Sequence, residues 1–260
     1  MMRMETLSYK TLEAQGYSGY LLRDAPEKVL QFGEGNFLRA FVDYWFDVSN
    51  EKAGWNGKCV LVQPIPQGLA SPINRQKGLY TLYLRGRQNG NKVDRKRVIS
   101  SVSRCLNPYE AEDYAAMMAL AVSDDLEYVV SNTTEAGIVY DPACKPDDAP
   151  PASFPAKLTQ VLYARWKAGR PGLVILSCEL IDNNGRELLR CVNRYIDQWA
   201  LEPEFRTWVM GECTFCSTLV DRIVPGRVKD PIEAAAMEAA NGYRDDLIDV
   251  GEIFGVWNIE

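Results

Sequence analysis

The stretch "KVLQFGEGNFLRAFVDYWFD", from Lys28 to Asp47, decides the fold of this chain. Its apolar start is typical of a buried strand, Gly33 and Gly35 follow at once, and an amphipathic helix begins after them. A strand, glycine turn and helix in this order open a dinucleotide-binding unit, in which the first glycine permits a tight turn and the second lets the backbone approach a pyrophosphate. The third glycine of that fingerprint would fall where this chain has Leu38.

The missing third glycine does not exclude phosphate binding. A helix start binds phosphate through its free N–H groups and its dipole, and here those groups belong to Asn36, Phe37 and Leu38. Arg39 lies in the same first turn, from which a guanidinium can hold a phosphate with two hydrogen bonds. We therefore expect a phosphate site at Gly33–Arg39. An ordinary strand-to-helix turn that uses glycine for its backbone freedom is the alternative.

Strand-like and helical patterns alternate along the chain. The strand-like runs cover residues 28–32, 59–63, 126–132 and 172–178, and the helical patterns cover 37–50, 109–122, 154–168 and 185–200. The third run of the alternation is preceded by a helix for which Asn107 is a plausible N-cap. Such alternation predicts an α/β fold with a Rossmann-type, doubly wound and mostly parallel sheet.

Two segments interrupt this alternation. Residues 79–106 carry two β-rich runs on either side of Asn89-Gly90, which predicts an inserted β-hairpin that leaves the sheet. Residues 140–155 contain five prolines and predict an ordered loop or a flexible connection. The last residues, 249–260, end on an apolar strand-like run, as expected for a chain cut at a domain boundary.

The composition is that of a globular protein of one or two domains, and it excludes several kinds of site. Of the 260 residues 47% are hydrophobic, and a net charge of −6 without a basic block makes nucleic acid an unexpected partner. The longest apolar run, 115–122, is too short to span a bilayer, and the N-terminus lacks the apolar core of a secretory signal. Seven irregularly spaced cysteines predict reduced thiols in the cytoplasm. The absence of histidine removes Ser-His-Asp and Cys-His nucleophiles and histidine metal ligands, so no metal is expected.

Polar residues follow three of the apolar strands, at the sheet edge where ligands bind in doubly wound folds. Gln63 ends the second strand, where an acid would bind a ribose, and its amide does not distinguish NAD from NADP. The segment "SNTTEAG" places Asn132, Thr133 and Glu135 on the same side, although these residues also favour a polar turn.

The segments "SCELIDNNG" (177–185) and "FCSTLVDRIVP" (215–225) complete this set of candidates. Asn184 can polarise a carbonyl oxygen during hydride addition, while Asn-Asn-Gly is also a common turn before a helix. Asp221 and Arg222 lie among apolar residues, which indicates either a functional pair or a structural clamp.

Two further motifs have structural interpretations. Cys213 and Cys216 have the CxxC spacing of a zinc or redox site, without a second pair or a histidine to complete it. Tyr163 and Lys167 have the spacing of the short-chain dehydrogenase motif, but a proline-rich loop precedes them where that family has a serine-bearing strand. An amphipathic surface helix is the better interpretation.

Together "LQFGEGNFLRAFVD", "SNTTEAGI", "SCELIDNNG" and "STLVDRIVPG" resemble the mannitol dehydrogenase family of long-chain polyol and uronate oxidoreductases. In that family a two-glycine turn followed by Asn-Phe-x-Arg is a variant of the fingerprint. The resemblance implies that residues 1–260 are an NAD-binding Rossmann-type domain and that the reaction is hydride transfer between NAD(H) and a sugar acid, tagaturonate or altronate. It also places Asn184 near the reacting oxygen and Asp221 on the cofactor side.

The same resemblance implies a second, helical domain that carries a catalytic lysine and that this chain lacks. We therefore expect the chain to bind the cofactor and to turn over substrate poorly. Fructuronate or a hexitol is an alternative substrate, and a non-catalytic nucleotide-binding module is an alternative of another class. The sequence gives no oligomeric state.

Overall fold

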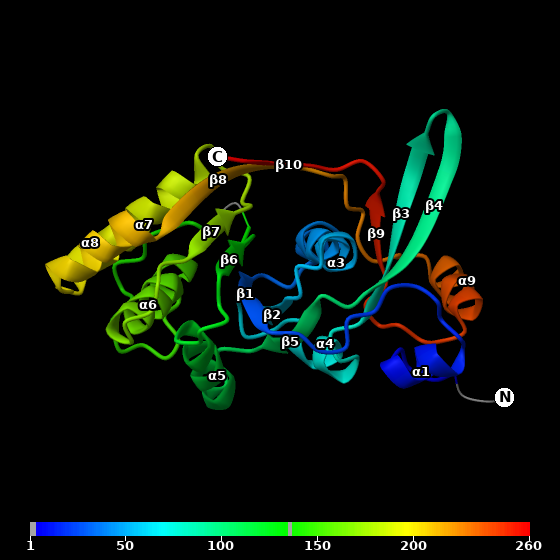
Figure 1. Ribbon diagram of the computed structural model, residues 1–260, viewed down its shortest axis with the longest axis horizontal. Coiled ribbons are helices and arrows are strands. Elements are labelled where there is room, and N and C mark those ends of the chain that lie inside the picture. Colours follow the sequence, from blue (N-terminus) through cyan, green and yellow to red (C-terminus); the bar gives the residue numbers. More distant parts are fainter. Residues whose placement is uncertain (1–3, 135–136) are drawn as a thin grey trace.

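The computed structural model describes residues 4–134 and 137–260, which form a seven-stranded sheet, a three-stranded sheet and the helices around them (Figure 1). The larger sheet has the strand order β10-β8-β7-β6-β1-β2-β5. Its strands are β1 (Glu27–Phe32), β2 (Lys58–Val62), β5 (Val102–Leu106), β6 (Tyr128–Ser131), β7 (Val174–Ser177), β8 (Thr214–Asp221) and β10 (Val256–Ile259). All neighbours pair in parallel except β10, which is antiparallel to β8. The parallel part has the doubly wound Rossmann order, so the predicted fold is confirmed.

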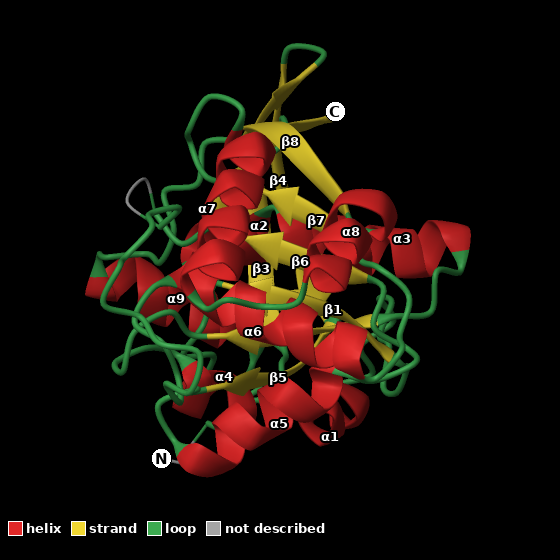
Figure 2. Cartoon of the chain, turned by 90° about the vertical axis from the view of Figure 1, so that its left-hand side faces the viewer, coloured by secondary structure: helices red, strands yellow, loops and turns green. Residues whose placement is uncertain are grey.

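Helices cover both faces of this sheet and enclose two apolar clusters (Figure 2). One face carries α5 (Ala111–Ala121), α6 (Phe154–Lys167), α7 (Asn184–Gln198) and α8 (Pro203–Glu212). The other carries α2 (Asn36–Ala40), α3 (Val42–Ala53) and α4 (Ala70–Arg75). Helices α1 (Tyr9–Ala14) and α9 (Pro231–Asn241) lie at the far end of the molecule, beside the smaller sheet. Burial on both faces explains why the central strands are continuous apolar runs.

The helix expected at 37–50 is two helices. Phe41 separates α2 from α3 with φ −118° and ψ −74°, and Leu38 O accepts a hydrogen bond from Phe41 N at 3.3 Å. The glycine turn is therefore followed by a helix of five residues before the longer α3 begins.

The predicted hairpin is present and forms part of a second sheet. Strands β3 (Tyr80–Gln88) and β4 (Asn91–Ile99) pair on either side of Asn89-Gly90, and β9 (Asp249–Glu252) adds to β3 in parallel. The last part of the 79–106 segment is different from the expectation, because residues 102–106 return to the main sheet as β5. The hairpin extends away from the body of the molecule (Figure 1).

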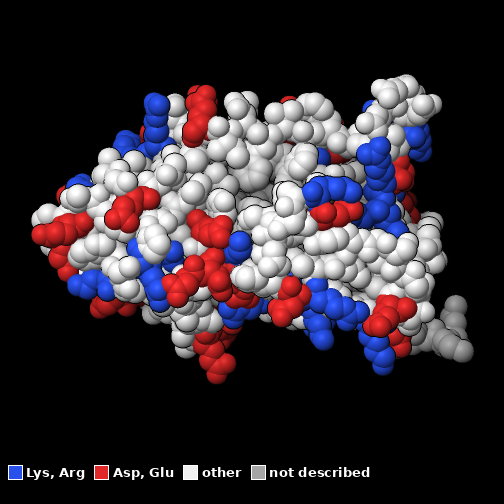
Figure 3. Space-filling model, viewed as in Figure 1, with Lys and Arg blue, Asp and Glu red and all other residues white. Residues whose placement is uncertain are grey.

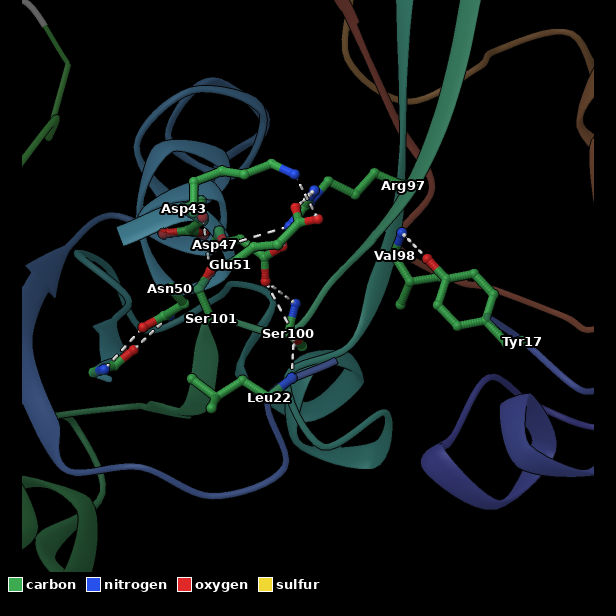
Figure 4. Close-up of polar contacts among 12 residues, drawn as sticks. Tyr17, Leu22, Asp43, Asp47, Asn50, Glu51, Arg97, Val98, Ser100 and Ser101 are labelled. Atoms are coloured by element: carbon green, nitrogen blue, oxygen red, sulfur yellow. Dashed lines mark hydrogen bonds and ion pairs between the residues drawn. The ribbon is translucent and has the colours of Figure 1, made fainter. Parts of the chain in front are cut away.

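A charged network around the buried Asp47 fastens the base of this hairpin to α3 (Figure 4). The fully buried Asp47 accepts hydrogen bonds from Arg97 Nε at 2.6 Å and from Ser100 N at 2.8 Å. Glu51, one turn further along α3, accepts from Arg97 Nη1 at 2.6 Å. The second sheet is thus attached to the helix that follows the glycine turn.

Other elements differ from the sequence pattern in their bounds. Helix α5 begins at Ala111, and Asn107 instead accepts a hydrogen bond from Tyr109 N in the turn before it. Strand β8 was not expected, because its alternating and partly exposed side chains do not form a clear apolar run. The proline-rich segment is the ordered loop of the two alternatives, since side chains of α6 and α7 donate to its carbonyls.

No helix within the described ranges has both the length and the apolar character needed to cross a bilayer. Acidic and basic side chains are interspersed over the face shown in Figure 3.

Candidate functional site

The glycine turn leaves an open space in front of one glycine and a tight contact at the other. Gly33 has φ +119°, and a Cβ atom there would lie 2.8 Å from Asn132 O, so only glycine fits. Gly35 caps α2 with φ −69° and ψ 171°, and an added Cβ would meet no atom within 4 Å. The first glycine permits close backbone packing, and the second keeps the front of the turn accessible.

Leu38 is directed away from this open space. Its side chain is 1% exposed and packs in the apolar cluster between the sheet and α3. It would lie 3.0 Å from a Cβ on Gly33, which shows that it fills the place behind the turn. The residue in place of the third glycine therefore joins the core.

Arg39 has a different role from the one expected, because its guanidinium is buried and occupied by the protein. Its three nitrogens donate to Glu34 O, Leu247 O and Asn36 Oδ1 at 3.2, 2.7 and 2.6 Å. The side chain is 2% exposed. It is not free to reach a phosphate, and that expectation is corrected.

Gln63 is also occupied within the protein. Its Nε2 donates to Ile65 O and Pro66 O at 2.9 Å each, and its Oε1 accepts from Ala70 N at 3.3 Å. The amide orders the loop after β2 and is buried, so the expected contact with a ribose hydroxyl does not fit.

Asn184 likewise joins the start of α7 to the loop after β7 and to β8 instead of facing a ligand. Its Nδ2 donates to Glu179 O and to Thr218 O at 2.9 Å each, and its Oδ1 accepts from Thr218 N and Gly185 N at 2.9 Å each. Every polar atom of this amide has a partner and the residue is 1% exposed. The expected contact with a substrate oxygen is therefore corrected to a link between the start of α7 and β8.

The loop after β6 is organised by the buried carboxylate of Glu179. This residue lies in the segment "SCELIDNNG", and its sequence gave it no separate role. Glu179 accepts hydrogen bonds from Thr133 N and Oγ1, both at 3.1 Å, and from Ser131 Oγ at 3.0 Å. Burial raises the pKa of Glu179 above its ordinary value. Asn132 Nδ2 donates to Cys178 O at 2.7 Å, so the loops after β6 and β7 are joined directly. Glu135 lies outside the described residues.

A pocket of about 640 Å³ opens where these loops meet. It is lined by Phe37, Asn132, Thr134, Leu180, Val220, Asp221, Arg222 and Ile223. These residues come from the ends of β6, β7 and β8 and from α2, which follows β1. Strand β1 pairs with both β2 and β6, so the pocket lies beside the point where the strand order reverses.

The structure brings together three predicted residues, Phe37, Asn132 and Asp221. The adjacent residues Asp221 and Arg222 have different surroundings. Asp221 is exposed and lines the pocket. Arg222 is 6% exposed and donates to Ala40 O and Phe254 O at 2.7 and 3.0 Å. The sequence pattern indicated both residues. It did not show that Asp221 faces the pocket while Arg222 bonds to backbone carbonyls.

A second carboxylate, not predicted, connects the turn with the loop after β2. Glu34 lies between the two glycines and is 8% exposed, and its Oε1 accepts from Leu69 N at 3.4 Å. Burial raises the pKa of Glu34.

The tyrosine–lysine motif and the CxxC motif both have structural roles in this fold. Tyr163 Oη and Lys167 Nζ both donate to the Glu202 carboxylate, at 2.8 and 2.9 Å, on the outer surface of α6. Cys213 packs against one apolar cluster and Cys216 belongs to the other, so the two thiols lie on opposite faces of the sheet.

Comparison with known proteins identifies the family. Residues 27–260 match the mannitol dehydrogenase Rossmann domain. The chain belongs to the mannitol dehydrogenase family. It is 46% identical over 239 residues to an altronate oxidoreductase of Phocaeicola vulgatus, covering 90% of this chain and 49% of the relative. It is 44% identical over 256 residues to one of Klebsiella pneumoniae, covering 96% and 52%. The chain thus spans about half the length of these relatives.

Two solved structures share the fold of this chain. The chain is similar to Pseudomonas fluorescens mannitol 2-dehydrogenase in a ternary complex with NAD and D-mannitol, with a TM-score of 0.83 and 21% identity. That match covers 98% of this chain and 54% of the other. A substrate-free D-sorbitol dehydrogenase matches with a TM-score of 0.78 and 23% identity, covering 98% and 55%.

Proposed function

We propose that this chain is the NAD(H)-binding part of an oxidoreductase that interconverts a sugar acid and its keto form, altronate and tagaturonate. The observation that carries the proposal is the open glycine turn at the start of α2, next to a pocket beside the strand-order reversal. Identity of 43–46% to altronate oxidoreductases supports the sugar-acid class.

The residues present fit a dinucleotide. The open face of Gly35 gives a pyrophosphate access to the amides of Asn36, Phe37 and Leu38. The pocket beyond it has an apolar wall, formed in part by Leu180 and Val220, that suits a planar ring and excludes water. When bound there, the nicotinamide ring supplies the hydride carrier.

Asn132 and Asp221 are the groups of this chain that we assign to orienting the bound cofactor. Both residues line the pocket. The side-chain amide of Asn132 is held in place because its Nδ2 donates to Cys178 O. A fixed amide at this position orients a ligand group at little entropic cost.

Proton transfer to the sugar oxygen requires a group from outside this pocket. Its titratable lining residues among those described are Asp221 and Arg222, and Arg222 is held by two backbone carbonyls. Lys157, whose pKa burial lowers to about 8, donates to Ala152 O and Tyr109 Oη and does not line the pocket. We therefore propose that a lysine of a further domain completes the site, as the resemblance to the family implies.

Calorimetry with NADH and a turnover assay test this proposal together. We expect the 260-residue chain to bind NADH in the micromolar to millimolar range and to show no measurable reduction of tagaturonate. Absence of binding at millimolar NADH would contradict the cofactor assignment, and normal turnover would contradict the need for a further domain.

Fructuronate and hexitols are the alternative substrates, and the fold shared with a mannitol-bound enzyme supports the second. A substrate panel on a protein that also contains the second half of the relatives' length distinguishes them. Binding of NADH without turnover of any substrate in that longer protein would instead support a non-catalytic nucleotide-binding module. We also propose a cytoplasmic location, since all seven cysteines are free thiols and six are buried.

A further inference from the structure

The end of α2 is held by side chains from distant parts of the chain. A helix leaves its last carbonyls without partners inside the helix, and the break at Phe41 creates such carbonyls immediately after the glycine turn. Tyr80 Oη, from β3, donates to Arg39 O at 2.7 Å. Arg222 Nη1, from the end of β8, donates to Ala40 O at 2.7 Å. The break is thus satisfied by two buried donors, one from each sheet.

The start of α2 is held by Arg39. Its guanidinium donates to Glu34 O and Asn36 Oδ1, which belong to the residues on either side of Gly35. The same group donates to Leu247 O, just before β9, and its Nη2 lies 3.6 Å from Asp249 Oδ2 at the start of that strand. One side chain therefore ties both flanks of Gly35 to the second sheet.

Aromatic rings keep Arg222 in place. Its guanidinium carbon lies 4.8 Å from the ring centre of Tyr44, 5.6 Å from that of Trp45 and 5.7 Å from that of Phe41. These rings belong to the break and to the first turn of α3, so Arg222 joins β8 to both sides of the break. Cation–π contacts of this kind stabilise a buried guanidinium without a carboxylate.

Such external support is needed because α2 has only five residues. A helix of this length is not stable by itself in water, since its few hydrogen bonds do not offset the cost of nucleation. Hydrogen bonds from its first amides to a phosphate weaken steeply when their angle changes. The tilt of α2 therefore affects any ligand bound at the turn.

We propose that Tyr80, Arg39 and Arg222 are positioning residues, through which the second sheet and the end of β8 set the angle at which the amides of α2 face a bound pyrophosphate. This inference rests on the proposed function, because it concerns the orientation of the same turn. None of the three residues needs to touch the pyrophosphate, and Tyr80 and Arg39 do not line the pocket.

Tyr80→Phe tests the proposal with a matched control on the same strand. The change removes one buried hydroxyl, which releases Arg39 O and also ends the longer, 3.2 Å contact with Asp43 Oδ2. Tyr83→Phe also removes one buried hydroxyl from β3, but that hydroxyl donates to Asn241 Oδ1 of α9 at 2.6 Å, away from the turn. NADH, ADP-ribose and adenosine are then titrated into each protein, because the first two carry the pyrophosphate and the third does not.

We expect Tyr80→Phe to weaken NADH and ADP-ribose by about tenfold each, the effect of roughly one hydrogen bond, and to leave adenosine unchanged. Tyr83→Phe should change the affinity for each of the three ligands by less than about twofold. A general loss of stability would instead weaken binding in both variants alike. Arg222→Lys retains the charge but lacks the planar fork whose two nitrogens bond separate carbonyls, so it should repeat the pyrophosphate-specific loss.

The outcomes separate this inference from the proposed function. A folded Tyr80→Phe protein that binds NADH like the wild type overturns the positioning role, as does an equal loss in Tyr83→Phe. If adenosine binds too weakly to be measured, the NADH affinities of the two variants decide the question alone. A wild-type chain that binds no NADH overturns the proposed function instead.

Discussion

The glycine turn and the rim of the neighbouring pocket are built in opposite ways. Behind the turn, Arg39 and Tyr80 are nearly fully buried and their polar groups bond to backbone carbonyls. At the rim, Leu180 and Ile223 are 68% and 67% exposed, and Asp221 is exposed as well. In this contrast, buried polar side chains hold the glycine turn from the rear, whereas the rim of the pocket carries exposed side chains without such bonds to the backbone.

The two glycines of the turn give the largest test of this contrast. Gly33→Ala should lower the free energy of unfolding by at least about 3 kcal/mol, because it combines strain at a positive φ with a backbone clash. Gly35→Ala has an allowed φ and open space, so its cost should be below about 1 kcal/mol. Urea denaturation of both variants measures the difference.

Binding should separate the same pair in a complementary way. Gly35→Ala places a methyl group in front of the turn, and we expect a folded protein with NADH affinity reduced at least about tenfold. A Gly35→Ala protein with unchanged affinity would show that the ligand does not approach this face.

The attachment of the second sheet to α3 gives the next largest effect. Asp47→Ala removes a fully buried carboxylate from Arg97 and Ser100, and we expect a loss of about 3 kcal/mol in the free energy of unfolding. Glu51→Ala removes the second, partly exposed partner of Arg97 and should cost less than about 1 kcal/mol. Equal costs by chemical denaturation would argue against the buried network as the anchor.

A smaller, pH-dependent effect comes from Asp43, a fully buried acid of α3 that accepts from Tyr80 Oη at 3.2 Å. Burial raises its pKa from 3.8 to about 7. Between these values the folded protein keeps a proton that the unfolded chain has released, so this group's contribution to stability falls as pH rises from about 4 to about 7.

Asp43→Asn tests that sign. The variant has no proton to lose, so its stability relative to the wild type should increase by about 1 kcal/mol per pH unit between pH 5 and pH 7. Asp125→Asn, at an exposed loop acid, is the matched control substitution. A wild-type protein that gains stability over this range relative to Asp43→Asn would contradict a buried, protonated Asp43.

The smallest effect on stability is expected at the rim. Asp221→Asn should change the free energy of unfolding by less than about 0.5 kcal/mol, because the side chain is exposed. Its affinity for NADH should fall by about threefold to tenfold, the loss of a single polar contact. Thermal melting and a fluorescence titration of NADH measure the two quantities on the same sample.

The fold was largely predictable because its determinants are local. The apolar run before Gly33 gave β1, the alternating pattern gave the parallel sheet, and Asn89-Gly90 gave the hairpin. Strand β9 was only part of an apolar end segment, and nothing in its sequence indicated that it pairs with β3, which lies more than 160 positions earlier. The break at Phe41 was also unpredicted. Its free carbonyls accept hydrogen bonds from Tyr80 and Arg222, which come from distant parts of the chain.

The candidate site was predictable in place but not in the roles of its side chains. Polar residues after parallel strands were expected at one edge of the sheet, and Phe37, Asn132 and Asp221 do line one pocket. Arg39 and Asn184 have the right residue types at the right edge. Their partners are Leu247 O and Thr218 O, which tertiary packing supplies and no local pattern shows.

Backbone amide NMR during a titration with NADH tests the central claim most directly. We predict that the amide signals of Asn36, Phe37 and Leu38 shift first and most, together with those of Asn132 and Asp221 around the pocket. Shifts confined to other regions, with the three amides at the start of α2 unchanged at saturating NADH, would contradict dinucleotide binding at this turn.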